Sequence, residues 1–245
     1  MKIALIGDVH ANLPALEAVL VHAHQNNVAA IWNIGDFVGY GAFPDEVVRL
    51  LRKEHAESII GNYDLKALKV KKKREKWEKS KIPEKWLAFQ WAYEHLSRKS
   101  RKYLHSLPRK LKIKVEGWRV LLVHGSPVSI EEHLTPSTPE SRLRELAAGV
   151  KADLIICGHS HQPFTRRVND TWFINTGSVG RPDDGDPRAS YAILELARGS
   201  LDVAHYRIEY DVERAAQAIR SAKLPEEFAQ MLLRGVSLDR LRSIP

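Results

Sequence analysis

The sequence predicts an α/β domain in which a parallel half precedes an antiparallel half. In the first half, short apolar runs alternate with segments of helical periodicity, which is the pattern of βαβαβ units. In the second half, pairs of β-rich runs flank two-residue turn sequences, which is the signal of hairpins. The antiparallel strands must therefore join or face the first sheet.

Three strands are expected in the first half. They are IALI (3–6), AAIWNI (29–34) and ESII (57–60). After the first strand a helix is expected to open at Asn12, whose side chain suits an N-cap, with Pro14 in the first turn. After the second, a helix is expected from about Pro44 to Lys53. A basic segment follows the third strand, and aromatic residues between Ile82 and Leu107 indicate further helix.

Three hairpins are expected in the second half, around Glu116-Gly117, Asn169-Asp170 and Arg198-Gly199. From Asp211 the helical pattern returns, and the chain is expected to end in short polar turns. We see no internal repeat and no low-complexity linker. We therefore expect one domain over residues 1–245, with a basic helical insertion or cap region at about 65–107.

The composition is that of an ordinary globular protein. A chain of 245 residues is long enough to bury a substantial core. The single cysteine, Cys157, excludes an internal disulfide framework and fits a reducing compartment. We find no signal-peptide core and no membrane span, so we expect a cytoplasmic protein with no membrane partner. Homo-oligomerisation is left open.

The net charge of +8 is concentrated in one stretch. Between Lys66 and Lys85 ten Lys or Arg stand against three Glu, a local net charge of +7, and the remaining chain is close to neutral. Any electrostatic capture of nucleic acid would therefore belong to this segment. A solvated helical arm explains the charge equally well.

Five apolar runs end in polar side chains that can bind metals. These side chains are Asp8 and His10, Asp36, Asn62, His124, and His159 with His161; Asp64 follows in the same motif as Asn62. In open α/β sheets the loops beyond the carboxyl ends of the strands meet at one crevice. We therefore expect these five ends to lie together, with neighbouring glycines letting the backbone come close to a bound group.

The residue types indicate a centre with two divalent ions. Two aspartates, one asparagine and four histidines form a mixed oxygen and nitrogen set without thiolates, and seven ligands are too many for one ion. Two ions that share one carboxylate would use all seven and leave positions for water. Such a centre clamps a phosphoryl group and generates a nucleophilic hydroxide, and its net positive charge attracts an anionic phosphate ester.

The ordered motifs D-x-H, G-D-x-V-G-Y-G, G-N-x-D, H-G-S-P and G-H-x-H resemble the calcineurin-like metallophosphoesterase superfamily, in particular its small bacterial and archaeal phosphodiesterase-like branch. NTGSVGRP (175–182) matches a further loop of that branch. The resemblance implies an α/β (α+β) fold, a four-layer αββα sandwich in which helices flank two mixed β-sheets.

The resemblance also implies the ligand sets of two divalent ions, with Mn, Fe, Zn, Ni or Co as candidates. One ion would lie among Asp8, His10, Asp36 and His161. The other would lie among Asp36, Asn62, His124 and His159. Asp36 would bridge the two ions.

Two further residues are candidates to contact the substrate phosphate. They are Asn12, which could instead be only a helix cap, and Arg181, which could instead be a surface residue. The third motif of the superfamily commonly reads G-N-H-[DE], and here Tyr63 replaces its histidine. The metal set is unaffected, but the protonation of the leaving group is in question. Asp36, Asn62 and Tyr63 are the expected catalytic residues, with His133 as an alternative acid.

The sequence thus favours a metal-dependent phosphodiesterase in which a hydroxide bridging two ions attacks phosphorus in line. A diester carries one negative charge fewer than a monoester, which suits a site without the usual histidine. The alternatives are a phosphomonoesterase or protein phosphatase, and, from another class, a non-catalytic scaffold or a nucleic-acid-binding protein. The complete ligand set argues against a scaffold.

Overall fold

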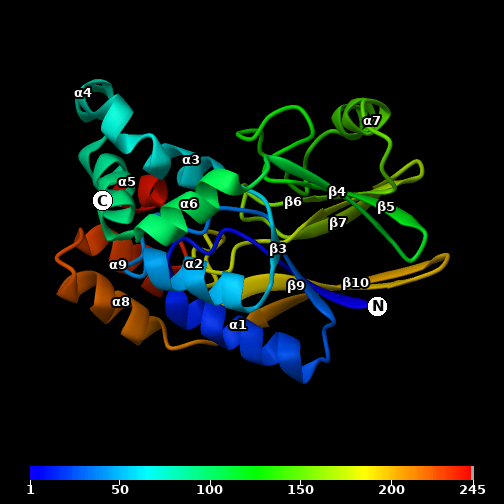
Figure 1. Ribbon diagram of the computed structural model, residues 1–245, viewed down its shortest axis with the longest axis horizontal. Coiled ribbons are helices and arrows are strands. Elements are labelled where there is room, and N and C mark those ends of the chain that lie inside the picture. The colour runs from blue at the N-terminus through cyan, green and yellow to red at the C-terminus, as the bar shows by residue number, and fades with distance from the viewer. Residues whose placement is uncertain (244–245) are drawn as a thin grey trace.

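The structure is a computed structural model that describes residues 1–243, in which the strands form two mixed five-stranded sheets (Figure 1). The first sheet has the order β10-β9-β1-β2-β3. Its strands are β1 (Lys2–Ile6), β2 (Ala30–Asn33), β3 (Glu57–Ser58), β9 (Ala189–Ala197) and β10 (Ser200–Ile208). β1, β2 and β3 are parallel, whereas β9 is antiparallel to β1. The third predicted hairpin has therefore joined the sheet of the βαβ half.

The second sheet has the order β4-β5-β6-β8-β7. Its strands are β4 (Lys110–Val115), β5 (Trp118–Val123), β6 (Leu154–Cys157), β7 (Phe164–Val168) and β8 (Thr171–Asn175). β5, β6 and β8 are parallel, and the edge strands β4 and β7 pair antiparallel with β5 and β8. The remaining two predicted hairpins are confirmed as β4-β5 and β7-β8.

Alternation along the strands produces the layers. On β1, Ile3 and Leu5 belong to the apolar cluster between the two sheets, whereas Ala4 and Ile6 pack against helices on the opposite face. Side chains alternate between the faces of a sheet, so a strand covered on both faces must be apolar throughout. Truncating a fully buried side chain such as Leu5 to alanine would cost about 2–5 kcal/mol.

The second sheet is covered in the same manner. Val120 and Leu122 of β5 face the first sheet, and Leu121 and Val123 face the outer helix α7 (Glu140–Ala148). Helices α1 (Leu13–Gln25) and α2 (Pro44–Lys53) cover the outer face of the first sheet, as Figure 1 shows. The predicted four-layer αββα sandwich is confirmed.

Four helices follow β3 at one end of the sandwich (Figure 1). They are α3 (Asn62–Leu68), α4 (Val70–Ser80), α5 (Pro83–His95) and α6 (Arg98–Ser106). α4 carries most of the basic residues, and among its side chains only that of Val70 is buried. The low apolar content of α4 explains why it projects from the rest of the molecule.

The C-terminal region contains α8 (Val212–Ser221), α9 (Glu226–Arg234) and α10 (Leu238–Arg242). The predicted ending in short polar turns therefore missed helix α10. Leu238 is buried against Phe228 and other apolar side chains of this region, and this contact holds α10 beside α5. Within residues 1–243, no helix is both long and apolar enough to cross a membrane.

Candidate metal centre

The polar strand ends meet at one place between the two sheets. Asp8 and His10 follow β1, Asp36 follows β2, and Asn62 lies beyond β3; from the second sheet, His124 follows β5 and His159 and His161 follow β6. Six of these side chains are buried and His159 is half-buried. Because parallel strands of both sheets end here, all five motifs reach the same crevice.

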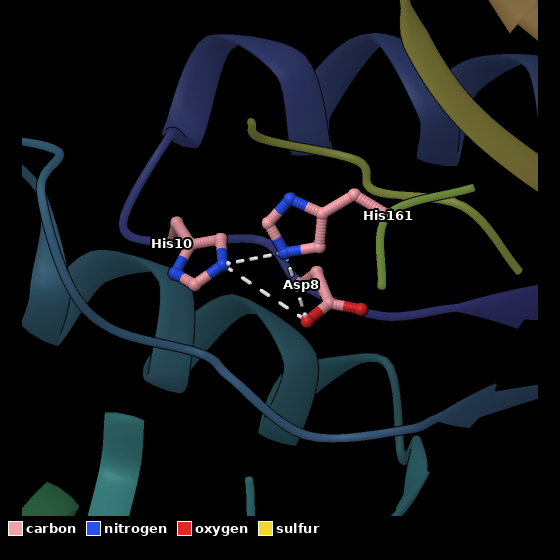
Figure 2. Close-up of side chains that lie close together, drawn as sticks. All are labelled: Asp8, His10 and His161. Carbon is pink, nitrogen blue, oxygen red and sulfur yellow. Dashed lines mark hydrogen bonds and ion pairs between the residues drawn. The ribbon is translucent and has the colours of Figure 1, made fainter. Parts of the chain in front are cut away.

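One cluster consists of Asp8, His10 and His161, whose side chains point toward one another in Figure 2. The Nε2 atoms of the two histidines are 3.2 Å apart. Asp8 Oδ1 is 3.4 Å from His161 Nε2 and 3.9 Å from His10 Nε2. Three potential ligand atoms therefore face a common point from two loops.

A second cluster consists of Asp36, His124 and His159. Asp36 Oδ2 lies 3.4 Å from His124 Nε2. The same His124 nitrogen is 3.0 Å from Asn62 Oδ1, and the opposite ring nitrogen donates to the carbonyl of Ile34 at 2.7 Å. This last hydrogen bond leaves Nε2 as the atom directed to a ligand position.

Asp36 contacts both clusters. Its Oδ2 atom, which faces His124, is also 3.9 Å from His10 Nε2 of the first cluster. Its Oδ1 atom accepts the backbone N–H of Tyr63 at 2.7 Å, which fixes the rotation of the carboxylate. The side chain therefore has the position that a shared ligand requires.

Strained backbone accompanies the clusters. Asp8, His10, Asp36, His159 and His161 all have left-handed backbone, with φ between 48° and 65°. L-residues other than glycine rarely adopt this conformation, at a cost of about 1 kcal/mol or more each. Strain at five of the seven predicted ligands indicates that the fold holds these side chains in a required geometry.

Two glycines let the carboxylates lie against the backbone. A Cβ atom at Gly61 would stand 2.0 Å from Asp36 Oδ1, and one at Gly158 would stand 2.5 Å from Asp8 Oδ2. Neither glycine has positive φ, so the requirement at both is for space and not for conformational freedom.

The four histidines of the clusters differ in protonation. Burial lowers the pKa of His10, and lowers the pKa of His159 to about 3. Burial also opposes charge on His124, but the Asp36 carboxylate outweighs it and raises the pKa to about 9. At His161, burial and Arg181 are outweighed by Asp8 and Asp183, so the pKa is raised. Each cluster thus contains one neutral histidine and one that retains a proton beside a carboxylate.

The donor set fits divalent metal ions. Asp8 Oδ1 is buried and has no hydrogen-bond partner within residues 1–243, although it faces the first cluster. A buried carboxylate oxygen without a donor is costly unless a cation satisfies it. Carboxylate oxygens with imidazole nitrogens suit Mn, Fe, Co, Ni and Zn.

Comparison with known proteins identifies the family. Residues 1–199 match the model of the calcineurin-like phosphoesterase superfamily domain. The chain belongs to this superfamily. The family is metal-dependent and acts on phosphate esters, which agrees with the two clusters of potential metal ligands.

The similarity to relatives extends over nearly the whole chain. An uncharacterized protein of Methanocaldococcus jannaschii is 32% identical over 250 residues, covering 95% of this chain and 98% of its own. The crystal structure of a metallophosphoesterase from Sphaerobacter thermophilus is 34% identical with a TM-score of 0.80, covering 96% of this chain and 99% of its own. A hypothetical protein from Pyrococcus horikoshii OT3 is 24% identical with a TM-score of 0.86, covers 96% and 98% respectively, and supports the fold.

A pocket of about 340 Å³ opens above the clusters, and Asp36, Asn62, His159 and His161 form part of its wall. Arg181 lines the same pocket and is only 13% exposed, so it is not a free surface residue. Its terminal nitrogen is 3.3 Å from His161 Nδ1, and its Nε atom is buried without a hydrogen-bond partner in the described part of the chain.

Tyr63 also lines the pocket, beside its hydrogen-bond partner Tyr40. The two hydroxyl oxygens are 2.7 Å apart, and the Arg181 guanidinium lies over the Tyr40 ring, 4.8 Å from its centroid. Burial, with a contribution from Tyr40, raises the pKa of Tyr63 well above 10. In the absence of bound cations the phenol is therefore neutral at physiological pH.

Asn12 is engaged elsewhere. Its side-chain oxygen accepts the N–H of Ala15, which confirms the predicted helix cap. Its amide donates to the carbonyl of Gly180 at 2.9 Å and to the hydroxyl of Tyr210 at 3.1 Å. Asn12 therefore joins the loop after β1 to the loop that carries Arg181, and phosphate contact through Asn12 stays a prediction.

Sequence reasoning assigned no role to Asp64, although it noted its motif. The buried Asp64 carboxylate accepts the backbone N–H groups of Asp36 at 3.0 Å, Val38 at 3.2 Å and Gly61 at 2.9 Å. Burial and the nearby Asp36 carboxylate nevertheless raise the pKa of Asp64 to about 7. Asp64 thus clamps the loop after β2 to the start of α3 and positions Asp36.

Two other pocket residues were not assigned as site residues. Asp183 lies 3.4 Å from His161 Nδ1 and 3.7 Å from Arg181, so it orients both side chains. His133 stacks on His159 with nearly parallel rings 4.3 Å apart. His133 was foreseen only as an alternative acid, and Asp183 has no local sequence signal beyond its proximity to Arg181.

Proposed function

We propose that this protein is a metal-dependent phosphodiesterase. The observation that carries the proposal is the pair of ligand clusters, with Asp36 in contact with both, at the base of a pocket of about 340 Å³. This volume is at the lower end of the range for small-molecule sites, so it fits a small phosphate ester better than a protein surface.

The two clusters assign the proposed ligands to two ions. Asp8, His10 and His161 would hold one ion, and His124, His159 and Asn62 the other, with Asp36 shared. Two divalent ions bound there would supply a bridging hydroxide for in-line attack and would neutralise charge on the phosphoryl group. In this proposal Asp36 and Asn62 act as catalytic residues through the ions that they hold.

Arg181 is the proposed phosphate-binding residue. Its guanidinium is buried at the pocket wall, Asp183 and Tyr40 orient it, and its Nε donor is free among the described residues. A planar guanidinium held in place binds phosphate oxygens through directed hydrogen bonds. Loss of this side chain should weaken the binding of any phosphate ester.

Tyr63 supports a diester preference. A neutral phenol with a raised pKa can donate a hydrogen bond to a phosphate oxygen, but it is a poor acid at neutral pH. A monoester dianion gains more than a diester from a cationic acid beside the leaving group. The replacement of histidine by Tyr63 therefore favours the less charged substrate.

The test compares bis(p-nitrophenyl) phosphate with p-nitrophenyl phosphate. Protein stripped by a chelator would be assayed after Mn, Fe, Zn, Ni, Co or Mg is restored. We expect metal-dependent hydrolysis with kcat/KM at least about tenfold higher for the diester, the scale of one modest acid contribution. A higher value for the monoester would instead identify a phosphomonoesterase. No bound metal and no restored activity would identify a scaffold.

We further propose that the helical region at about 65–107 is a cap within one domain. Lys66, Lys81, Lys85 and Phe89 of this region line the pocket that Asp36 and His161 also line. The ends of the basic segment thus lie beside the candidate centre, whereas most lysines of α4 are exposed. This placement brings Lys66, Lys81 and Lys85 beside the proposed substrate site. The exposed lysines of α4 remain a candidate nucleic-acid-binding surface.

A further inference from the structure

Three lysines stand on the pocket wall contributed by the cap, apart from the metal ligands. Lys66 comes from α3, Lys85 from α5, and Lys81 from the turn between α4 and α5. A solvated arm would direct its cations to water. These three side chains are half-buried and line the same cavity as the metal ligands.

Two of the lysines have carboxylate partners. Lys66 Nζ is 2.8 Å from Glu131, and Lys85 Nζ is 3.0 Å from Asp239 of α10. Lys81 has no carboxylate within 4 Å in the part of the chain that the structure describes, and its ammonium lies 5.1 Å and 5.6 Å from the ring centroids of Trp77 and Phe89. Lys81 is therefore a cation held in place by aromatic faces and not by an anion.

The surroundings of Lys81 disfavour its charge. Burial and the neighbouring Lys66 lower its pKa, and Lys85 acts in the same direction, while Glu131 opposes them in part. An anion placed among the three ammonium groups would remove this repulsion and complete the hydrogen bonding of Lys81. The wall is thus complementary to a negatively charged group that the chain itself does not provide.

We propose that the substrate is a phosphodiester that carries a second phosphate group, an inference that rests on the proposed function. Lys81 binds this second phosphate, while the metal clusters and Arg181 hold the scissile phosphate. Lys66 and Lys85, each already paired, shape the same wall. Lys81 is then a specificity-determining residue, and its contribution is absent for diesters that lack a second anion.

The test measures binding to the metal-loaded protein by calorimetry. The probes represent the phosphomonoester product that hydrolysis of a diester leaves. They are adenosine 5′-monophosphate, with one phosphate, and adenosine 5′-diphosphate and adenosine 3′,5′-bisphosphate, which place a second phosphate at two separations. We expect at least one of the latter two to bind about tenfold to a hundredfold more tightly than the monophosphate, the scale of one hydrogen bond to a charged group.

Matched variants isolate the lysine. Lys81→Met should reduce the preference to about twofold or less, because the second phosphate loses its contact while other residues still hold the first. Lys81→Arg keeps the charge and should keep the preference. Lys79→Met removes an equal charge from an exposed position of α4 outside the pocket wall, and should change neither affinity.

Two results would overturn the proposal. One is a wild-type protein with no preference for either probe that carries two phosphates. The other is an undiminished preference in Lys81→Met. Hydrolysis of bis(p-nitrophenyl) phosphate, which has no second phosphate, separates this inference from the proposed function. If that activity is present while the preference is missing, only the role of Lys81 fails.

Discussion

Reloading the metal-stripped protein with divalent ions should release about one to two protons at pH 7. A histidine must lose the proton from its ligand nitrogen before it binds a metal. The pKa of about 9 keeps His124 protonated at pH 7, and the raised pKa of His161 keeps part of its population protonated. His10 and His159, whose pKa values are lowered, are already neutral and release nothing.

The size of the pH effect on metal affinity follows from the pKa of His124. Its pKa of about 9 lies about two units above pH 7, so deprotonation costs about 3 kcal/mol, or about a hundredfold in apparent affinity for the ion of the second cluster. This penalty declines as the pH approaches 9. Apparent affinity should therefore rise by up to about tenfold per pH unit between pH 7 and 9, and then level off.

Calorimetric titration with Mn²⁺ in buffers of different ionisation enthalpy measures the number of protons released. Repeating the titration near pH 9 should give about half a proton for His124, because the group is then half deprotonated. As a control, Asp36→Asn should lower the pKa of His124 in the stripped protein, read from the imidazole resonances by NMR. Zero proton release at pH 7, or affinity that does not change between pH 7 and 9, would refute the assignment.

The same pKa shift affects stability. A folded-state pKa of about 9, above the ordinary value of 6.5, stabilises the stripped protein fully below about pH 6.5. That contribution is lost as the pH rises through about 9. The difference between a pKa of 6.5 and one of about 9 corresponds to about 3 kcal/mol, so the free energy of unfolding of the stripped protein in urea should decrease across this window. Stability that increases from pH 7 to 9 would contradict the shift.

Three further predictions concern single residues, and a fourth concerns the basic segment of α4. Asp36→Asn should reduce bound metal from about two equivalents to well below one, and the loss of only one ion would argue against a shared ligand. Tyr63→Phe should lower kcat for aryl diesters by no more than about tenfold to a hundredfold, whereas inactivity equal to that of Asp36→Asn would make Tyr63 an effective acid. Gly61→Ala should abolish metal retention because its Cβ would collide with Asp36, while Gly149→Ala, whose Cβ meets nothing closer than 3.7 Å, should be neutral. Reversing the charge of Lys71–Lys73 should abolish salt-sensitive retention of DNA or RNA and spare hydrolysis of a small diester, and unchanged retention would identify a solvated arm.

Local patterns predicted most of the framework. The bounds of α2 agree with the expected Pro44–Lys53, and Asn12 caps α1 as expected. These features depend on residues close together in the chain. By contrast, α7 was not predicted, because its nine residues bury only Leu143 and Leu146, too short an apolar pattern to separate a helix from a loop.

Short motifs predicted which candidate ligands lie close together. Each predicted ligand lies at a strand end, and the topology of the sheets brings the ends together. The supporting contacts were not predictable, because they join residues far apart in the chain. Asp64 holds the backbone of Asp36, and Tyr40 meets Tyr63, only after two loops have packed.

The left-handed backbone at the predicted ligand residues raises the question of which interactions hold the site together. Left-handed backbone at five positions costs about 5 kcal/mol or more, comparable to the total stability of many domains. Backbone hydrogen bonds offset this cost. The N–H groups of Asp8 and His10 donate to Gly35 and Asp36 at 3.0 Å, and Gly180 donates to Asp8 at 3.1 Å. These bonds join the loops after β1 and β2 to the loop that carries Arg181.

The loops that carry the ligands are therefore ordered by bonds of the chain to itself. The Asp36 and Asp8 carboxylates raise the pKa values of His124 and His161, two of the predicted ligands. In the proposed centre, metal binding would replace these protons by cations, and its pH dependence would report on the Asp8 and Asp36 carboxylates.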